Sequence, residues 1–222
     1  MDFGFSEEQE MLRSSARDFL AKEAPMTYVR KMMDDERGYT DELWRKMDGL
    51  GWMGLILPEE VGGSGLDFVD MVVVLEEMGR AVLPGPFFST VILAGVAIAE
   101  GGSAAQKAAY LSKIADGSLK ATLAHLEPSG RWDADGIQLE AKPDGGGYVL
   151  TGTKLFVPDA NVVDLYVVAA DPRAVHERAV AAGAKVTREL NETDYGSFEF
   201  GFADPEGNQW SVGTYPGEPR KT

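Results

Sequence analysis

The sequence predicts an α+β protein: an N-terminal helical bundle of about six helices, then a mainly antiparallel β-domain that ends in a β-α-β-β-β half-module. Up to about Leu119, capping signals and glycine or proline breakers separate segments of helical periodicity. From Leu123 the pattern changes to strand-like alternation, and after Ala170 one helical segment precedes three short strand candidates. We therefore expect three parts, residues 1–119, 120–170 and 171–222.

Composition restricts the class of partner. With 222 residues, 44% of them hydrophobic and 26% charged, the chain can bury a core. Its formal charge of -15 repels nucleic acid and anionic membranes, so we expect neither as a partner. The acidic N-terminus is unlike a signal peptide, and the longest apolar run, Val91 to Ala99, is too short to span a bilayer. These features favour a cytoplasmic protein.

The first helices are marked by caps and breakers. Ser6 and Gln9 form a capping box, which predicts a helix from near Ser6 to before Pro25. A second helix is expected around residues 28–34 and a third after Thr40. The glycines of Pro58 to Gly65 predict a turn rather than a phosphate cradle, because no Gly-Lys-Ser or G-x-G-x-x-G pattern follows.

Three further helices complete the predicted bundle. The segment Asp67 to Gly79 predicts a central, buried helix that is apolar on most faces. Its apolar residues are Phe68, Met71, Val72, Val74, Leu75 and Met78. A very apolar helix is expected from about Ser89 to Glu100, and a second capping box at Ser103 and Gln106 begins a helix that Gly117 ends.

Alternation predicts the start of the β-domain. Ile137, Leu139 and Ala141 alternate with polar residues, the chain turns at residues 144–147, and strand formers follow from Tyr148. The pattern predicts an antiparallel sheet over residues 123–159.

Several motifs carry a resemblance to the acyl-CoA dehydrogenase family. They lie at Leu50–Leu55, Pro58–Gly65, Glu76–Arg80 and Tyr110–Gly117, in the order and spacing usual for that family's N-terminal domain. The β-segment adds Leu126-Glu127-Pro128 at the place of the family's T-E-P segment and Lys154-Leu155-Phe156-Val157-Pro158 at the place of its K-x-W-I-T strand. The resemblance covers Met1 to about Ala170.

The resemblance implies FAD as cofactor and an acyl-CoA as substrate, dehydrogenated across its α,β carbons. It places the flavin ring against Leu126, Glu127, Pro128, Phe156, Val157 and Pro158. Phe156 could stack on the flavin, or it could be a core residue of a strand. Leu126 and Pro158 replace two threonines whose hydroxyls donate hydrogen bonds in the family, so we expect FAD binding to be weak or absent in the isolated chain.

The tail resembles a different family. Past Ala170 the dehydrogenase pattern stops, and the C-terminal helical domain that carries that family's catalytic glutamate is missing, so we expect no catalytic residue and no activity from this chain alone. Residues 171–184 predict a helix, and three strands are expected around 185–190, 198–203 and 209–215. With Val163 to Ala169 as a first strand, this order resembles half of a glyoxalase-like, vicinal oxygen chelate protein.

The tail is not expected to bind a metal by itself. Ser211 stands where that family has a glutamate ligand, and His176 fits a surface position on the helix.

The sequence favours the first of three functions and leaves the other two as alternatives. The chain is an acyl-CoA dehydrogenase-related flavoprotein that works as a homo-oligomer or with an acyl-CoA dehydrogenase partner subunit, or a glyoxalase-like binding or lyase-like module that dimerises through its tail, or a fusion with no selected function.

Overall fold

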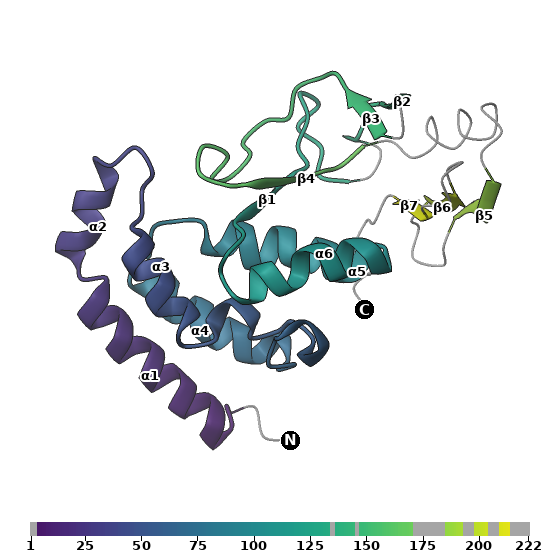
Figure 1. The fold of residues 1–222 in the computed structure, drawn as a ribbon. Coiled ribbons are helices and arrows are strands. Elements are labelled where there is room, and N and C mark those ends of the chain that lie inside the picture. The colour runs from purple at the N-terminus through teal and green to yellow at the C-terminus, as the bar shows by residue number, and fades with distance from the viewer. Residues whose placement is uncertain are drawn as a thin grey trace.

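The computed structural model describes residues 4–133, 136–144 and 147–170, together with the backbone of three strands at 185–192, 198–203 and 209–213. Helices fill the first half of the chain and strands the second, as the sequence predicts (Figure 1). The expected tail helix at 171–184 lies outside the described residues.

The helices follow their predicted caps. They are α1 (Glu7–Glu23), α2 (Met26–Met33), α3 (Asp41–Asp48), α4 (Phe68–Arg80), α5 (Val96–Gly101) and α6 (Ala104–Ala115), with short 3₁₀ turns η1 (Trp52–Gly54) and η2 (Glu59–Val61). The capping boxes at Ser6 and Ser103 are both formed, and Thr40 caps α3. The segment expected as one helix from Ser89 divides into a π-helix, η3 (Phe88–Gly95), and α5.

The glycine loop before α4 is a packed turn, as predicted. The N–H groups of Gly63, Ser64 and Gly65 donate to the carbonyls of Pro58, Gly54 and Leu57. A Cβ at Gly63 would lie 2.0 Å from the Leu57 carbonyl oxygen, so only glycine fits. Because these N–H groups are used internally, the loop does not present them to a phosphate.

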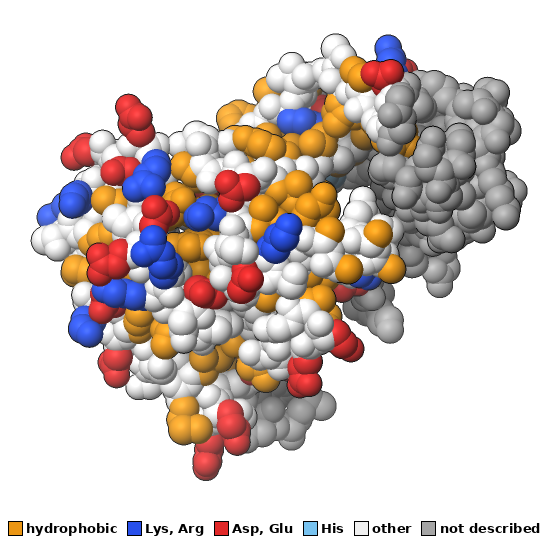
Figure 2. Space-filling model, in the orientation of Figure 1, with side chains coloured by type: hydrophobic (Ala, Val, Ile, Leu, Met, Phe, Trp, Pro, Cys, Tyr) orange, Lys and Arg blue, Asp and Glu red, His pale blue; other side chains and the backbone are white. Residues whose placement is uncertain are grey.

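Helix α4 contributes to the core as predicted, but it is buried on one face and other apolar side chains of the helix are exposed. Met71, Val73 and Val74 are fully buried, whereas Phe68 and Val72 are 51% and 38% exposed. Apolar side chains therefore also reach solvent on α4, and Figure 2 shows hydrophobic groups scattered among charged ones on one face of the molecule.

Polar contacts fix α1 along α4. The side-chain amide of Gln9 donates to Asp70 at 3.0 Å, and the Arg13 guanidinium donates to Glu76 at 3.0 Å. Arg17 donates to both carboxylate oxygens of the buried Glu77, at 2.6 and 3.0 Å. These hydrogen bonds from Arg17 outweigh burial and lower the pKa of Glu77, so the carboxylate stays charged.

In the part of the chain that the structure describes, seven strands follow. They are β1 (Ala121–Ala124), β2 (Ala141–Asp144), β3 (Gly147–Leu150), β4 (Leu165–Val168), β5 (Lys185–Glu192), β6 (Phe198–Ala203) and β7 (Gln209–Gly213). β2 and β3 form the predicted antiparallel hairpin, and β5, β6 and β7 form a three-stranded antiparallel sheet close to the expected positions. Burial alternates at Ile137, Leu139 and Ala141 as predicted, although the strand itself begins only at Ala141.

The pairing of β1 differs from the expected antiparallel sheet. β1 pairs in parallel with β4, so the segment proposed as the first strand of the tail module instead extends the sheet that begins at β1. Leu165 and Val167 of β4 pack with Ile114 and Ala121 in a hydrophobic core that is separate from the one around α4. Thr90 of η3 joins this core to β1, because its hydroxyl donates to the Ala121 carbonyl at 3.1 Å and accepts from the Ala121 N–H at 3.1 Å.

Candidate functional site

The structure brings the two predicted site segments together. The N–H of Leu155 donates to the carbonyl of Leu126 at 2.7 Å, and the Thr122 hydroxyl donates to the carbonyl of Pro158 at 2.8 Å. The stretch Lys154 to Pro158 therefore runs antiparallel beside β1 and its extension. It is not itself a strand, which corrects the prediction: Phe156 has a φ of 49°, which interrupts extended pairing, and Pro158 has no N–H to donate.

A buried ion pair fastens the two segments. Lys154 Nζ lies 2.7 Å from Glu127 Oε1, and both side chains are less than a tenth exposed, at 8% and 9%. Lys154 also donates to the His125 carbonyl at 3.1 Å. Because each buried charge has several partners, the pair fixes the geometry of the site without leaving a charge unpaired.

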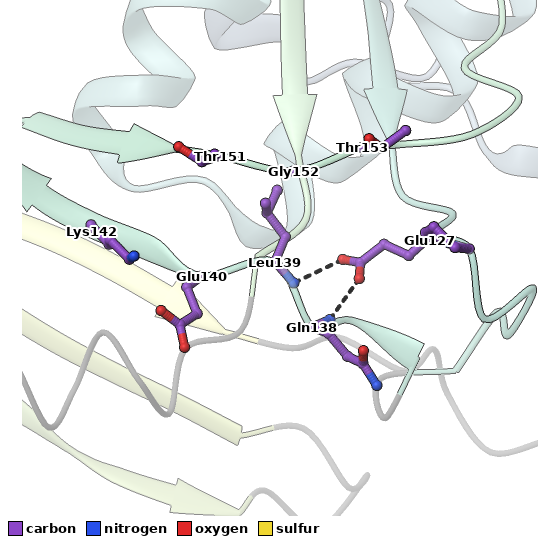
Figure 3. A pocket seen from close by; sticks show the side chains of 9 residues that line it. Glu127, Gln138, Leu139, Glu140, Lys142, Thr151, Gly152 and Thr153 are labelled. Atoms are coloured by element: carbon purple, nitrogen blue, oxygen red, sulfur yellow. Dashed lines mark hydrogen bonds between the residues drawn. The ribbon is translucent and has the colours of Figure 1, made fainter.

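The Glu127 carboxylate is held by the following segment as well. Its oxygens accept from the N–H groups of Gln138 and Leu139 at 2.9 and 3.0 Å (Figure 3). Burial by itself would raise the pKa of Glu127, but the hydrogen bonds from Lys154 and the two N–H groups outweigh it and lower that pKa. Glu127 is therefore an ionised structural anchor and a poor proton acceptor.

The six predicted site residues differ in their exposure to solvent. Leu126 and Glu127 are buried, so neither offers its side chain to a flavin. Pro128 and Pro158 are exposed, and Val157 is partly buried. Phe156 is 85% exposed, so the alternative that it is a core residue is wrong.

Phe156 stands on a supported loop. Three residues after it, Asp159 accepts a hydrogen bond of 2.6 Å from the buried Ser89 hydroxyl of η3, whose oxygen also lies 3.1 Å from the Pro86 carbonyl oxygen. Sequence reasoning missed Ser89, Thr122 and Asp159, because their partners are 36 to 70 residues away in the chain.

A cavity of about 320 Å³ opens beside the ion pair (Figure 3). Its lining combines polar and apolar groups and comes from the Leu126–Pro128 segment, from residues 138–142 and from residues 151–153: Glu127, Pro128, Gln138, Leu139, Glu140, Lys142, Thr151, Gly152 and Thr153. Hydroxyls, an amide and an ammonium group are available there to a polar ligand.

The predicted site residues fit the face of a flavin ring but not its polar edge. The isoalloxazine ring is flat, and the exposed Phe156 ring offers the apolar surface on which such a ring stacks. The side chains of Leu126 and Pro158 cannot donate to its polar edge, so those hydrogen bonds would have to come from main-chain groups or from the hydroxyls nearby.

The described residues include neither a metal-binding cluster nor a helix able to span a membrane. In the ranges with described side chains, no group of three or more His, Asp or Glu residues could hold a metal ion. His176 and the side chain of Ser211 lie outside those ranges, so the expectation for the tail stays a prediction. No helix in the described part of the chain is long and apolar enough to cross a bilayer.

Known proteins resemble the chain over most of its length. Residues 6–118 match the acyl-CoA dehydrogenase N-terminal domain, and residues 100–213 match a glyoxalase-like domain. The mitochondrial isovaleryl-CoA dehydrogenase of Pongo abelii is 32% identical over 168 residues, which cover 73% of this chain and 40% of that protein.

Solved structures agree with the sequence matches. An acyl-CoA dehydrogenase of Bacillus anthracis complexed with FAD is similar with a TM-score of 0.66 and 29% identity, over 75% of this chain and 29% of that one. The ChsE4-ChsE5 complex of Mycobacterium tuberculosis is similar with a TM-score of 0.68 and 25% identity, over 92% of this chain and 50% of that one.

The chain spans half or less of the length of these proteins. Its own first half nevertheless matches the family's N-terminal domain from the first cap to the end of α6. The chain belongs to the acyl-CoA dehydrogenase family through its N-terminal domain, and it carries a glyoxalase-like domain that begins within the same helical region.

Proposed function

We propose that the chain is a flavoprotein-type module that binds FAD weakly at the surface formed by the exposed Pro128, Phe156 and Pro158, with Leu126, Glu127 and Val157 contributing their main chain. The observation that carries the proposal is the exposed Phe156 ring beside the two hydrogen-bonded segments. A large aromatic ring at 85% exposure, on a loop tied to η3 and β1, is available for stacking by the flat ring of a ligand.

The chemistry that follows is binding rather than turnover by this chain alone. FAD, when bound, would supply a two-electron acceptor for dehydrogenation of an acyl-CoA. Proton abstraction needs a base with a pKa near the working pH, and Glu127 is unsuited because Lys154 and two N–H groups hold it ionised. We therefore propose that dehydrogenation requires groups from a second copy or from a related subunit.

Replacing the exposed ring tests the proposal. Phe156→Ala should weaken FAD binding about tenfold in equilibrium dialysis, because the loss of an aromatic contact and its buried area approaches a tenfold change. Phe68→Ala is the matched control, since Phe68 is 51% exposed but lies on α4 in the helical half. Equal FAD affinity for both variants, or no FAD binding by the unmodified chain, would refute the proposal.

A second candidate function rests on the glyoxalase-like match at residues 100–213 and on the antiparallel β5–β6–β7 sheet. Under it, the chain is a binding or lyase-like module that dimerises through its tail, and the helical half is a scaffold. A chain of this kind would bind no FAD, so the same dialysis separates the two candidates.

A further inference from the structure

Trp132 is an exposed aromatic ring that is nevertheless held in place. Its side chain is 73% exposed, and its ring stacks on that of His125 with centroids 5.8 Å apart and planes inclined by 10°. The His125 ring also contacts the loop backbone, because its Nε2 lies 3.1 Å from the Trp132 carbonyl oxygen, which accepts the hydrogen. The outer face of the indole is therefore fixed toward solvent.

The loop around Trp132 is closed by its own polar groups. The Arg131 guanidinium donates to both oxygens of the Asp133 carboxylate, at 2.9 Å each, and Asp133 also accepts from the Gly136 N–H at 3.1 Å. At the start of the loop, the Gly130 N–H donates to the Glu127 carbonyl at 2.9 Å. Because Arg131 is bound to Asp133, the exposed contact that the loop offers is an aromatic face rather than a positive charge.

Trp132 shares a support with the Phe156 loop. The ring of His125 stacks on that of Trp132, and the carbonyl of His125 accepts a hydrogen bond from Lys154. The next carbonyl, that of Leu126, accepts from Leu155, which precedes Phe156. Two exposed aromatic rings are thus attached to consecutive residues of one segment.

We propose that Trp132 stacks on the adenine ring of a nucleotide, supplied either by FAD or by coenzyme A. The proposal rests on the function proposed above, in which Phe156 covers the flavin ring. FAD has two flat rings joined by a flexible pyrophosphate linker, which two separate aromatic platforms suit, and coenzyme A carries one adenine. Stacking needs no net charge, so it suits a chain whose formal charge of -15 repels anions.

The test is equilibrium dialysis of the full chain against FAD, coenzyme A and FMN, which has the flavin ring but no adenine. Trp132→Ala should weaken binding of FAD, of coenzyme A or of both about tenfold, and leave FMN binding unchanged. Trp132→Phe keeps a ring and should restore most of the affinity. Phe68→Ala is the control for loss of an exposed ring elsewhere, and thermal melting of each variant checks that it is folded.

The arms of the experiment identify the source of the adenine. Loss confined to FAD assigns Trp132 to the cofactor, and loss confined to coenzyme A assigns it to the substrate. The inference is overturned if Trp132→Ala leaves the affinities for FAD and coenzyme A unchanged, or if it weakens FMN binding as much as theirs. In either case the proposed function stands as long as the unmodified chain binds FAD. If neither FAD nor FMN binds the unmodified chain, the proposed function fails, and the Trp132 inference fails with it unless coenzyme A binding depends on Trp132.

Discussion

Single residues decide how the site is held together. Glu127 and Lys154 are buried together, and each also bonds to backbone groups, so the pair joins the Leu126–Pro128 and Lys154–Pro158 segments. Removing one partner leaves the other as an unpaired buried charge, which is more damaging than removing both.

Glu127→Gln should therefore lower the free energy of unfolding by about 3–5 kcal/mol, since it leaves Lys154 without its counter-ion. Glu76→Gln is the matched control, because Glu76 pairs with Arg13 but is 56% exposed, and such pairs contribute about 0–1 kcal/mol. Urea unfolding of the two variants beside the unmodified chain measures the difference, and similar losses for both would show that the Glu127 pair is not special.

The same pair makes stability depend on pH. The pKa of Glu127 is lower in the folded chain than its ordinary value of 4.5, so its stabilising contribution is complete above pH 4.5 and is lost as the pH falls through the folded pKa. The free energy of unfolding of the unmodified chain should fall more steeply than that of Glu127→Gln below pH 4.5. Parallel curves would contradict this assignment.

At the scale of elements, adjacent residues of α4 differ sharply in burial. Val73 is fully buried, and Val72, the preceding residue, is 38% exposed. Val73→Ala should cost about 2 kcal/mol of unfolding free energy, since it removes buried methyl groups and leaves a cavity. Val72→Ala should cost well under half as much, and equal losses measured by thermal unfolding would place α4 differently.

Local chemistry made the helices predictable. The caps at Ser6, Thr40 and Ser103 act within three residues of the chain, and the sequence alone locates those helix starts. The π-helical turn of η3 has no comparable local signal. Its Thr90 bonds to Ala121, a partner 31 residues away that a pattern of neighbours does not include.

The site was predictable only in part for the same reason. The resemblance located Phe156 and the neighbouring segments, but periodicity indicated a strand where the structure has a loop with a positive φ. The parallel pairing of β1 with β4 joins residues 44 apart, such as Ala121 and Leu165, and no short-range alternation distinguishes it from an antiparallel hairpin.

At the scale of the whole molecule, the edge strands of the tail sheet predict how the tail packs. The β5–β6–β7 sheet has β5 and β7 at its edges within the described residues, and open edges are usually paired or covered. We expect the tail to pack either on this chain's own β-domain or on the tail of a second copy. The division at residues 119 and 170 remains a prediction.

Sedimentation of the full chain beside a chain ending at Ala170 tests the packing of the tail. If two tails pair, the full chain should be a dimer and the shorter chain a monomer. If the tail packs internally, both chains should be monomers and the shorter one should be less stable. Two monomers of equal stability would contradict both forms of packing.

The absorbance spectrum of FAD in the presence of the chain, recorded without oxygen before and after addition of an acyl-CoA, tests the central claim most directly. If FAD binds beside Phe156, the flavin absorbance band should be perturbed. Because Glu127 is held ionised by its hydrogen bonds and is a poor base, adding the acyl-CoA should leave that band unbleached. An unperturbed spectrum would contradict flavin binding, and bleaching of the band by the acyl-CoA would contradict the claim that this chain alone does not dehydrogenate it.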